Sequence, residues 1–246
     1  MKRITMTIAV IVMAAGMMTS CSGGDAPAKD GPFGKLPAII KGAQEQAFDM
    51  MTKLFSASNK EEAGKIMDEV EKIKKQAEED ATKAFDEIKN KEVPVEVSEE
   101  VPVKFTTPLT ITEFDVSHGK VMLEGDIETT APVSYYQKET TFPYHMIRVI
   151  LIDKEGNPSF LVGKPGTQFE GDPKDGIYPA GTKGHFKKEV EVELWNADMI
   201  ANMSKVRIVE FDSDIYKQAK EVSDTAKARD NERQRELFKN IKISIK

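Results

Sequence analysis

Apolar positions recur at helical spacing through the first third of the chain. Between residues 38 and 55 they return every three or four positions, which predicts an amphipathic helix. Ser58 followed three residues later by Glu61 is a capping-box pattern that opens a second helix. Its apolar stripe runs over residues 63–88 and predicts a helix of about 30 residues. A short connection between two such helices favours an antiparallel, partly coiled-coil-like αα-hairpin over residues 38–91.

The pattern changes at residues 92–104. Glu-Val-Pro-Val occurs twice there, at 92–95 and again at 100–103. Pro94 and Pro102 cannot continue a helix and push their predecessors towards extended conformations. The segment is therefore predicted to be a linker or a ragged edge strand at a domain boundary.

Beyond this boundary the apolar period becomes two, which predicts strands separated by turns. The expected strands cover residues 105–107, 109–116, 120–128, 147–153, 159–162, 186–194, 205–211 and 241–245. Asn196 is expected to cap a short helical turn, and Ser213 a longer helix inserted before the last strand. The fold class is thus α+β, a helical hairpin followed by an antiparallel sandwich over residues 105–246. The sandwich resembles the immunoglobulin-like fold in architecture, and this likeness implies no specific activity.

The N-terminus has the organisation of a secretion signal. Lys2 and Arg3 form a basic end, residues 4–18 are almost uninterruptedly apolar, and Thr19 and Ser20 are small. A run of about 15 apolar residues is short for a membrane span, which needs about 20. Residues 1–20 are therefore predicted to be a signal peptide.

Cys21 is the single cysteine of the chain and directly follows this segment. The sequence Met-Thr-Ser-Cys at 18–21 resembles the lipobox of bacterial lipoproteins, with methionine in place of the usual leucine. The resemblance implies cleavage before Cys21, a thioether link from its sulfur to diacylglycerol, and three acyl chains such as palmitate. Two acyl chains already give stable membrane anchoring. The alternative is an ordinary secretory signal with an incidental cysteine.

Residues 21–37 are rich in Gly, Pro, Ala and Asp and carry little apolar surface, so they are expected to be a flexible tether. Ser22, rather than Asp, follows the cysteine. By resemblance to the lipoprotein sorting rule, this favours the outer membrane. The periplasmic face is the expected location, and the cell surface is the alternative.

Composition restricts the partners. The chain has 35 Lys and Arg against 41 Asp and Glu, a net charge of −6, so nucleic acid and anionic lipid surfaces are unfavourable partners. A single cysteine allows no disulfide within the chain. Stability in an oxidising compartment must then come from packing.

Motifs that carry chemistry are missing from the sequence. It contains no GxSxG, HExxH, CxxC or phosphate-binding glycine loop, and we predict no catalytic residue, cofactor or metal. The three histidines, His118, His145 and His185, are scattered, and a triad or metal cluster made from them is the less favoured interpretation.

Two loops contain ligand-like side chains. Glu170, Asp172 and Asp175 offer oxygen atoms that suit calcium, although EF-hand spacing is missing and any exposed turn favours the same residue types. A second group could stack on a sugar or peptide, but such clusters more often close one end of a sandwich. Its members are Tyr135, Tyr136, Phe142 and Tyr144.

One short pattern concerns modification. Asp224-Thr225-Ala226 resembles the acceptor of an O-glycosylation system found in some Gram-negative envelopes. The resemblance implies that Thr225 carries a glycan. An intact helix at this position would hide its backbone from a transferase.

The expected function is that of a lipid-anchored envelope protein that binds a protein or glycan without catalysing a reaction. The hairpin either packs as core or forms a prong similar to those of tentacled envelope chaperones. The cluster of Phe48, Met50, Met51 and Phe55 would be a partner surface if exposed. The alternatives are an envelope glycan hydrolase with paired Asp and Glu residues, and a structural spacer without a ligand.

Overall fold

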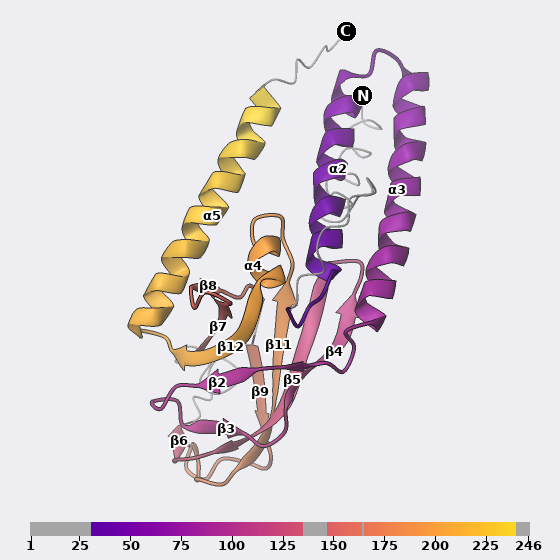
Figure 1. The fold of residues 1–246 in the computed structure, drawn as a ribbon. Helices are drawn as coiled ribbons and strands as arrows, with labels where there is room; N and C mark the ends of the chain where they lie inside the picture. Colours follow the sequence, from indigo (N-terminus) through magenta and orange to yellow (C-terminus); the bar gives the residue numbers. More distant parts are fainter. Residues whose placement is uncertain (1–30, 135–146, 164, 240–246) are drawn as a thin grey trace.

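The computed structural model describes residues 31–134, 147–163 and 165–239. Its chain begins with two helices, α2 (Leu36–Ser56) and α3 (Lys60–Asp86), which lie side by side and antiparallel (Figure 1). Mostly antiparallel sheets follow, so the fold class is α+β as predicted. The two helices match the predicted hairpin to within a few residues.

The connection between the helices is capped one residue later than predicted. The Asn59 side chain accepts a hydrogen bond from the Glu62 backbone N–H at 2.9 Å, and the Glu62 carboxylate accepts one from the Ser58 N–H at 2.8 Å. The N-cap is thus Asn59, with Glu62 bonding back to the Ser58 N–H, and the prediction of a capping box made by Ser58 and Glu61 was wrong. Asn is an N-cap residue at least as favourable as Ser, and the helix begins directly after Asn59.

The strands form two main sheets and a small ribbon. The larger sheet has the order β1 (Glu92–Val93), β4 (Leu109–Asp115), β5 (Lys120–Thr129), β11 (Lys183–Glu191) and β9 (Pro165–Phe169), with β3 (Val103–Phe105) also paired to β5. The second sheet has the order β2 (Val95–Val97), β12 (Met203–Glu210), β7 (Ile147–Asp153) and β8 (Pro158–Phe160). The ribbon pairs β6 (Val133–Ser134) with β10 (Ile177–Tyr178).

One pairing departs from the predicted antiparallel arrangement, because β2 runs parallel to β12. The segment at 92–104 contains β1, β2 and the start of β3. Pro94 lies between β1, at the edge of the larger sheet, and β2, at the edge of the second. Proline is tolerated at such edges because it has no N–H to donate to a neighbouring strand.

The inward faces of the two sheets share one hydrophobic core. The alternation in β5 and β11 sends every second side chain into it, including Leu123 and Phe186. Val149 and Ile208 enter it from the second sheet, and Phe85 enters it from the end of α3. The base of the hairpin and the β body are therefore parts of one packed unit.

The predicted tether ends earlier than residue 37. Phe33 and Leu36 are completely buried, and a Cβ at Gly31 would lie 2.8 Å from the carbonyl oxygen of Ala201. The high Gly and Pro content of this stretch predicted flexibility, although Phe33 and Leu36 within it are core residues. Residues 31–37 thus belong to the folded body, and residues 21–30 lie outside the described part.

Two helices follow the larger sheet. In α4 (Ala197–Ala201), the Asn196 side chain does not cap the helix as predicted, but bonds the Glu193 N–H and the Glu191 carbonyl instead. The second helix, α5 (Asp214–Lys239), packs against β7, β8 and β12. It continues through the polar residues 230–236, and the strand expected at 241–245 lies outside the described residues.

Candidate binding surface

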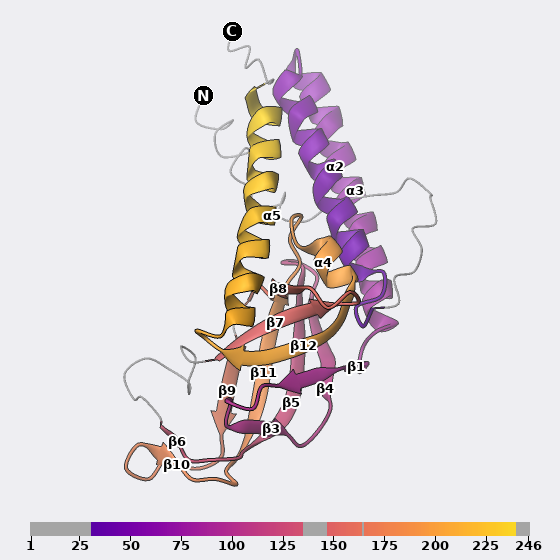
Figure 2. The same cartoon turned by 60° about the vertical axis from the view of Figure 1, so that its left-hand side comes forward.

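Three long helices, α2, α3 and α5, extend from the same end of the β body (Figures 1 and 2). Their lower parts pack on the sheets, whereas their upper parts extend beyond the strands. This end is the most distinctive surface of the molecule, and its construction determines what it can bind.

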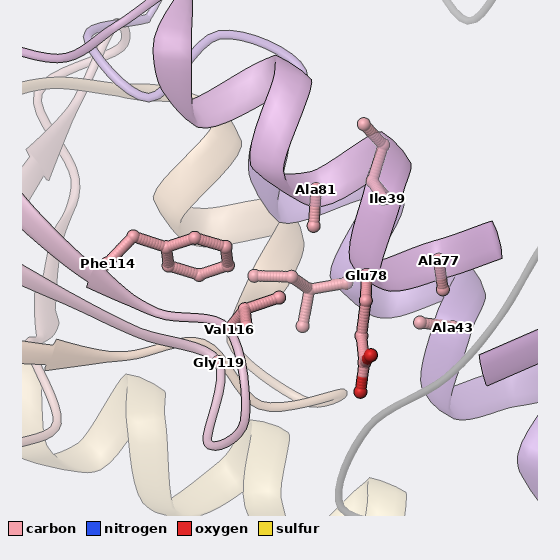
Figure 3. A pocket seen from close by; sticks show the side chains of 9 residues that line it. Ile39, Ala43, Ala77, Glu78, Ala81, Phe114, Val116 and Gly119 are labelled. Carbon is pink, nitrogen blue, oxygen red and sulfur yellow. The ribbon is translucent and has the colours of Figure 1, made fainter. Parts of the chain in front are cut away.

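The base of the hairpin is fixed by apolar packing. Phe114 and Val116, from the β4–β5 hairpin, lie against Ala81 of α3 (Figure 3). The Phe114 ring stacks on Phe85 with 5.4 Å between centroids. The cavity left between these groups is about 20 Å³, which is room for about one water molecule. This contact packs the helical hairpin against the β body, and the cavity in it is too small for a ligand.

Polar contacts reinforce the same joint. The Lys41 ammonium lies 2.5 Å from the Asp198 carboxylate, which joins α2 to α4. The Gln44 side-chain amide donates a hydrogen bond to the Val192 carbonyl at 3.2 Å. The lower half of α2 is therefore held by contacts of two kinds, and the hairpin direction is fixed relative to the sheets.

Helix α5 meets α2 through charged groups. The Arg233 guanidinium lies 3.5 Å from the Glu45 carboxylate. Burial raises the pKa of Asp230, and the nearby Glu45 charge acts in the same direction. The Lys227 ammonium lies 6.0 Å from the Trp195 ring centroid. Contacts of this kind at partly exposed positions contribute little stability.

The upper hairpin retains partly exposed apolar side chains. We call residues 54–70 the distal hairpin. Five of its large apolar side chains are only half-buried: Leu54, Phe55, Ile66, Met67 and Val70. Helix α5 runs up beside the hairpin to nearly the same height in Figures 1 and 2, and its ion pair with α2, Arg233 with Glu45, lies below the distal hairpin. The predicted Phe48–Phe55 cluster behaves differently, since Met50 and Met51 are buried and the two phenylalanines are half-buried.

The structure separates the histidines. His118 Nδ1 lies 2.6 Å from Asp115 in the β4–β5 turn, and His185 Nδ1 lies 2.8 Å from Asp126 near the other end of β5. His145 lies outside the described residues. In the part of the chain that the structure describes, no three His, Cys, Asp or Glu side chains come together as a metal site.

The other predicted site residues have separate locations. Glu170, Asp172 and Asp175 are exposed in the β9–β10 connection. Thr225 is exposed in the middle of α5, beside the Asp224–Lys220 ion pair of 2.5 Å. Cys21 and the aromatic group at 135–144 lie outside the described residues.

One carboxylate pair is present on the outer face of the larger sheet. Glu189 and Glu191 each lie 3.0 Å from the Lys120 ammonium. Burial raises the pKa of Glu189, but hydrogen bonds and the Lys120 charge outweigh it and leave the pKa lowered. A glycosidase general acid needs a raised pKa, and Glu189 lacks that property.

Sequence reasoning missed Lys188. It is 1% exposed, and its ammonium donates hydrogen bonds to the carbonyls of Leu161, at 2.8 Å, and Gly163. Burial lowers its pKa to about 7. The sequence did contain a signal: Lys188 lies two positions from Phe186 and from Val190, so it shares the inward face of β11 with them.

Comparisons with family models, curated proteins and solved structures gave no match to this chain. Among the helices that the structure describes, none is long and apolar enough to cross a membrane.

Proposed function

We propose that this chain is a lipid-anchored envelope protein whose helical end binds a protein partner and catalyses no reaction. Cys21 is the proposed lipidation site, and the outer membrane, facing the periplasm, is the proposed location. The lipobox-like sequence supports the anchor. The distal hairpin supports the binding role.

The half-buried apolar side chains of the distal hairpin are the observation that carries this proposal. Phe55 and Met67 are among them, on the two helices on either side of the connecting loop. An adaptable apolar surface of Met and Phe on a helical hairpin suits a protein partner better than a glycan. Because the hairpin base is fixed to the sheets, this surface is presented in one direction.

The shortened tether adds a limit on distance. Nine residues lie between Cys21 and Gly31, the first residue of the described body, and the ten Cα-to-Cα steps that join the two span at most about 33–36 Å. The folded body of the anchored chain would therefore begin within about 33–36 Å of the lipidated residue.

Site-specific photo-crosslinking in cells tests the binding role. A photoreactive residue at Phe55 or Met67 should give a discrete crosslinked protein. The matched controls are Lys65 and Glu71, exposed positions on the same helix as Met67. Equal crosslinking from all four positions would contradict a specific surface, and an absence of crosslinks would favour the structural spacer.

Partition of cells with detergent tests the anchor separately. We expect the wild-type chain in the membrane fraction and the Cys21→Ser variant in the soluble fraction. Membrane retention of the variant would contradict lipid anchoring through Cys21.

Two finer features are also proposed. An immunoglobulin-like relationship of the β body is supported by two mostly antiparallel sheets around one core. O-glycosylation at Thr225 is supported by its exposed position on α5. Intact-mass measurement of the protein from its own envelope, compared with Thr225→Ala, tests the modification.

A further inference from the structure

The β body is open on one side, between an edge of each main sheet. Among the strands that the structure describes, β2 pairs only with β12, and β3 pairs only with β5. The two strands lie one beside the other in Figures 1 and 2 and are joined by residues 98–102. An open cavity of about 400 Å³ is lined by β2, β3 and this connection.

The hydrophobic core is incompletely covered at this opening. Val95, Val97 and Phe105 line the cavity and pack against the core that the two sheets share, yet all three are only half-buried. Val101 and Val103, which also line the cavity, are buried. Covering the half-exposed side chains removes apolar surface from water, so the opening favours an apolar occupant.

The strand edge beside the cavity also offers backbone hydrogen bonds. The Pro94 carbonyl and the Ser98 N–H bond to β12 at 2.8 Å and 2.9 Å. Because bonding residues alternate along a strand, the backbone groups of Val95 and Val97 point away from β12. An edge of this kind can accept an additional strand from another chain. The occupant that fits is an extended segment with apolar side chains on one face.

The charge beside the opening is negative. Glu99 lines the cavity and Glu100 follows it, and both are exposed. Neither forms an ion pair with another residue that the structure describes. Lys104 also lines the cavity, but its ammonium lies 3.1 Å from the Glu128 carboxylate. An occupant with positive charges on its outer face would therefore be complementary.

The sequence of residues 241–245 has these properties. Isoleucine occurs at 241, 243 and 245, with Lys242 and Ser244 between them and Lys246 directly after. In an extended conformation the isoleucines share one face, and the lysines share the other.

This segment is too far from the cavity of its own chain. It follows α5, which points away from β2 and β3 in Figures 1 and 2. The 26 residues of α5 give it a length of about 39 Å. Ile245 comes six residues after Lys239, the last residue of α5, so its reach is at most about 20–22 Å. The cavity that it can enter belongs to another copy.

We propose that residues 241–245 of one copy insert as a strand between β2 and β3 of a second copy. The isoleucines cover Val95, Val97 and Phe105, and the lysines face the acidic rim. The donating and accepting surfaces differ, so the contact is head-to-tail and chains of more than two copies form. The proposal is independent of the partner at the distal hairpin and of the lipid anchor.

Sedimentation of the full chain in detergent tests the proposal. Wild type should associate into dimers and larger species as its concentration rises. Val97→Pro removes an N–H from the free edge of β2, and Ile243→Asn places an amide on the apolar face of the segment. Each should weaken association at least about tenfold. The matched controls are Val97→Ala, which keeps the N–H and should weaken association less than Val97→Pro, and Ser244→Asn, which should leave it unchanged.

Mixing the two defective variants gives a sharper result. Val97→Pro keeps an intact segment and Ile243→Asn keeps an intact cavity, so an equal mixture should form dimers that do not grow further. A synthetic peptide of residues 240–246 provides a measurement that does not depend on Val97→Pro being folded. This peptide should bind the Ile243→Asn chain, and the same peptide with Ile243→Asn should bind at least about tenfold more weakly.

Three results would overturn the proposal. The first is a monomeric wild type, and the second is association of both variants as strong as that of wild type, which would indicate a contact through another surface or through the anchors. The third is equal binding of the two peptides. A loss of thermal stability in Ile243→Asn at concentrations where wild type is monomeric would also contradict it, because the segment would then pack within its own chain.

Discussion

The ammonium nitrogen of Lys188 lies 2.8 Å from the carbonyl oxygen of Leu161, so a cation on β11 is bonded inside the body to the segment after β8. This relationship has a thermodynamic consequence. Burial lowers the pKa of Lys188 from 10.5 to about 7. Between these two values the unfolded chain keeps a proton that the folded chain has lost.

Folding stability should therefore rise with pH over this interval. The slope from Lys188 alone is up to about 1.4 kcal/mol per pH unit between about pH 7 and about pH 10. Below pH 7 the buried charge is fully present, and its cost is at its largest. Lys188→Met removes the charge while keeping the length of the side chain.

We expect Lys188→Met to be more stable than wild type by a few kcal/mol at pH 6, and by much less at pH 9. Thermal and urea unfolding at the two pH values measure the difference. Lys187→Met is the control, because its parent side chain is exposed and paired with Glu124. A pH-independent difference between Lys188→Met and wild type would show that Lys188 keeps an ordinary pKa.

Gly163 should be intolerant of any side chain. Its φ is +106°, and a Cβ would lie 2.0 Å from the Glu189 carbonyl oxygen. Gly163→Ala should cost more than about 3 kcal/mol, because backbone strain and a backbone clash act together. Gly156→Ala is the matched control, since its φ is +89° and nothing lies within 4 Å of its Cβ. That control should lose only about 1–2 kcal/mol, and equal losses in the two variants would exclude the clash as the cause.

The periodic parts of the fold could be predicted from sequence because their signals are local. The hairpin follows from a stripe repeated over several turns, and the alternation in β5 and β11 follows from side chains pointing to opposite faces. The parallel pairing of β2 with β12 joins residues more than a hundred positions apart, such as Val95 and Val206. Nothing in either strand alone specifies that partner.

The candidate sites could not be predicted from local patterns either, because they depend on contacts between distant parts of the chain. Residue types suggested calcium or histidine sites, yet His118 and His185 lie near opposite ends of β5, and among the described residues no three His, Cys, Asp or Glu side chains come together. The burial of Lys188 depends on its contact with the segment after β8, which no local pattern indicates. An inward-facing lysine in an apolar alternation was the visible clue, and it gains meaning only when the neighbouring elements are in place.

Phe33 tests the revised end of the tether. It is fully buried within a stretch whose composition predicted flexibility. Phe33→Ala should lower the free energy of unfolding by about 3–5 kcal/mol, as for a core phenylalanine. Leu54→Ala, in the half-exposed distal hairpin, should lose less than half of that amount. Urea unfolding of both variants checks the comparison, and a loss below about 1 kcal/mol for Phe33→Ala would restore the longer tether.

The start of α3 supplies the sharpest contrast between the sequence and the structure. Asn59 caps the helix through its side chain, whereas Ser58 contributes only its backbone N–H to the Glu62 carboxylate. Asn59→Ala should therefore cost about 1 kcal/mol, and Ser58→Ala should cost almost nothing. Hydrogen exchange at the first turn of α3 should accelerate in Asn59→Ala alone, because the Glu62 N–H loses its acceptor. The opposite ranking would show that Ser58 is the cap. Since this turn connects the two helices of the distal hairpin, a loosened cap should also reduce crosslinking from Phe55.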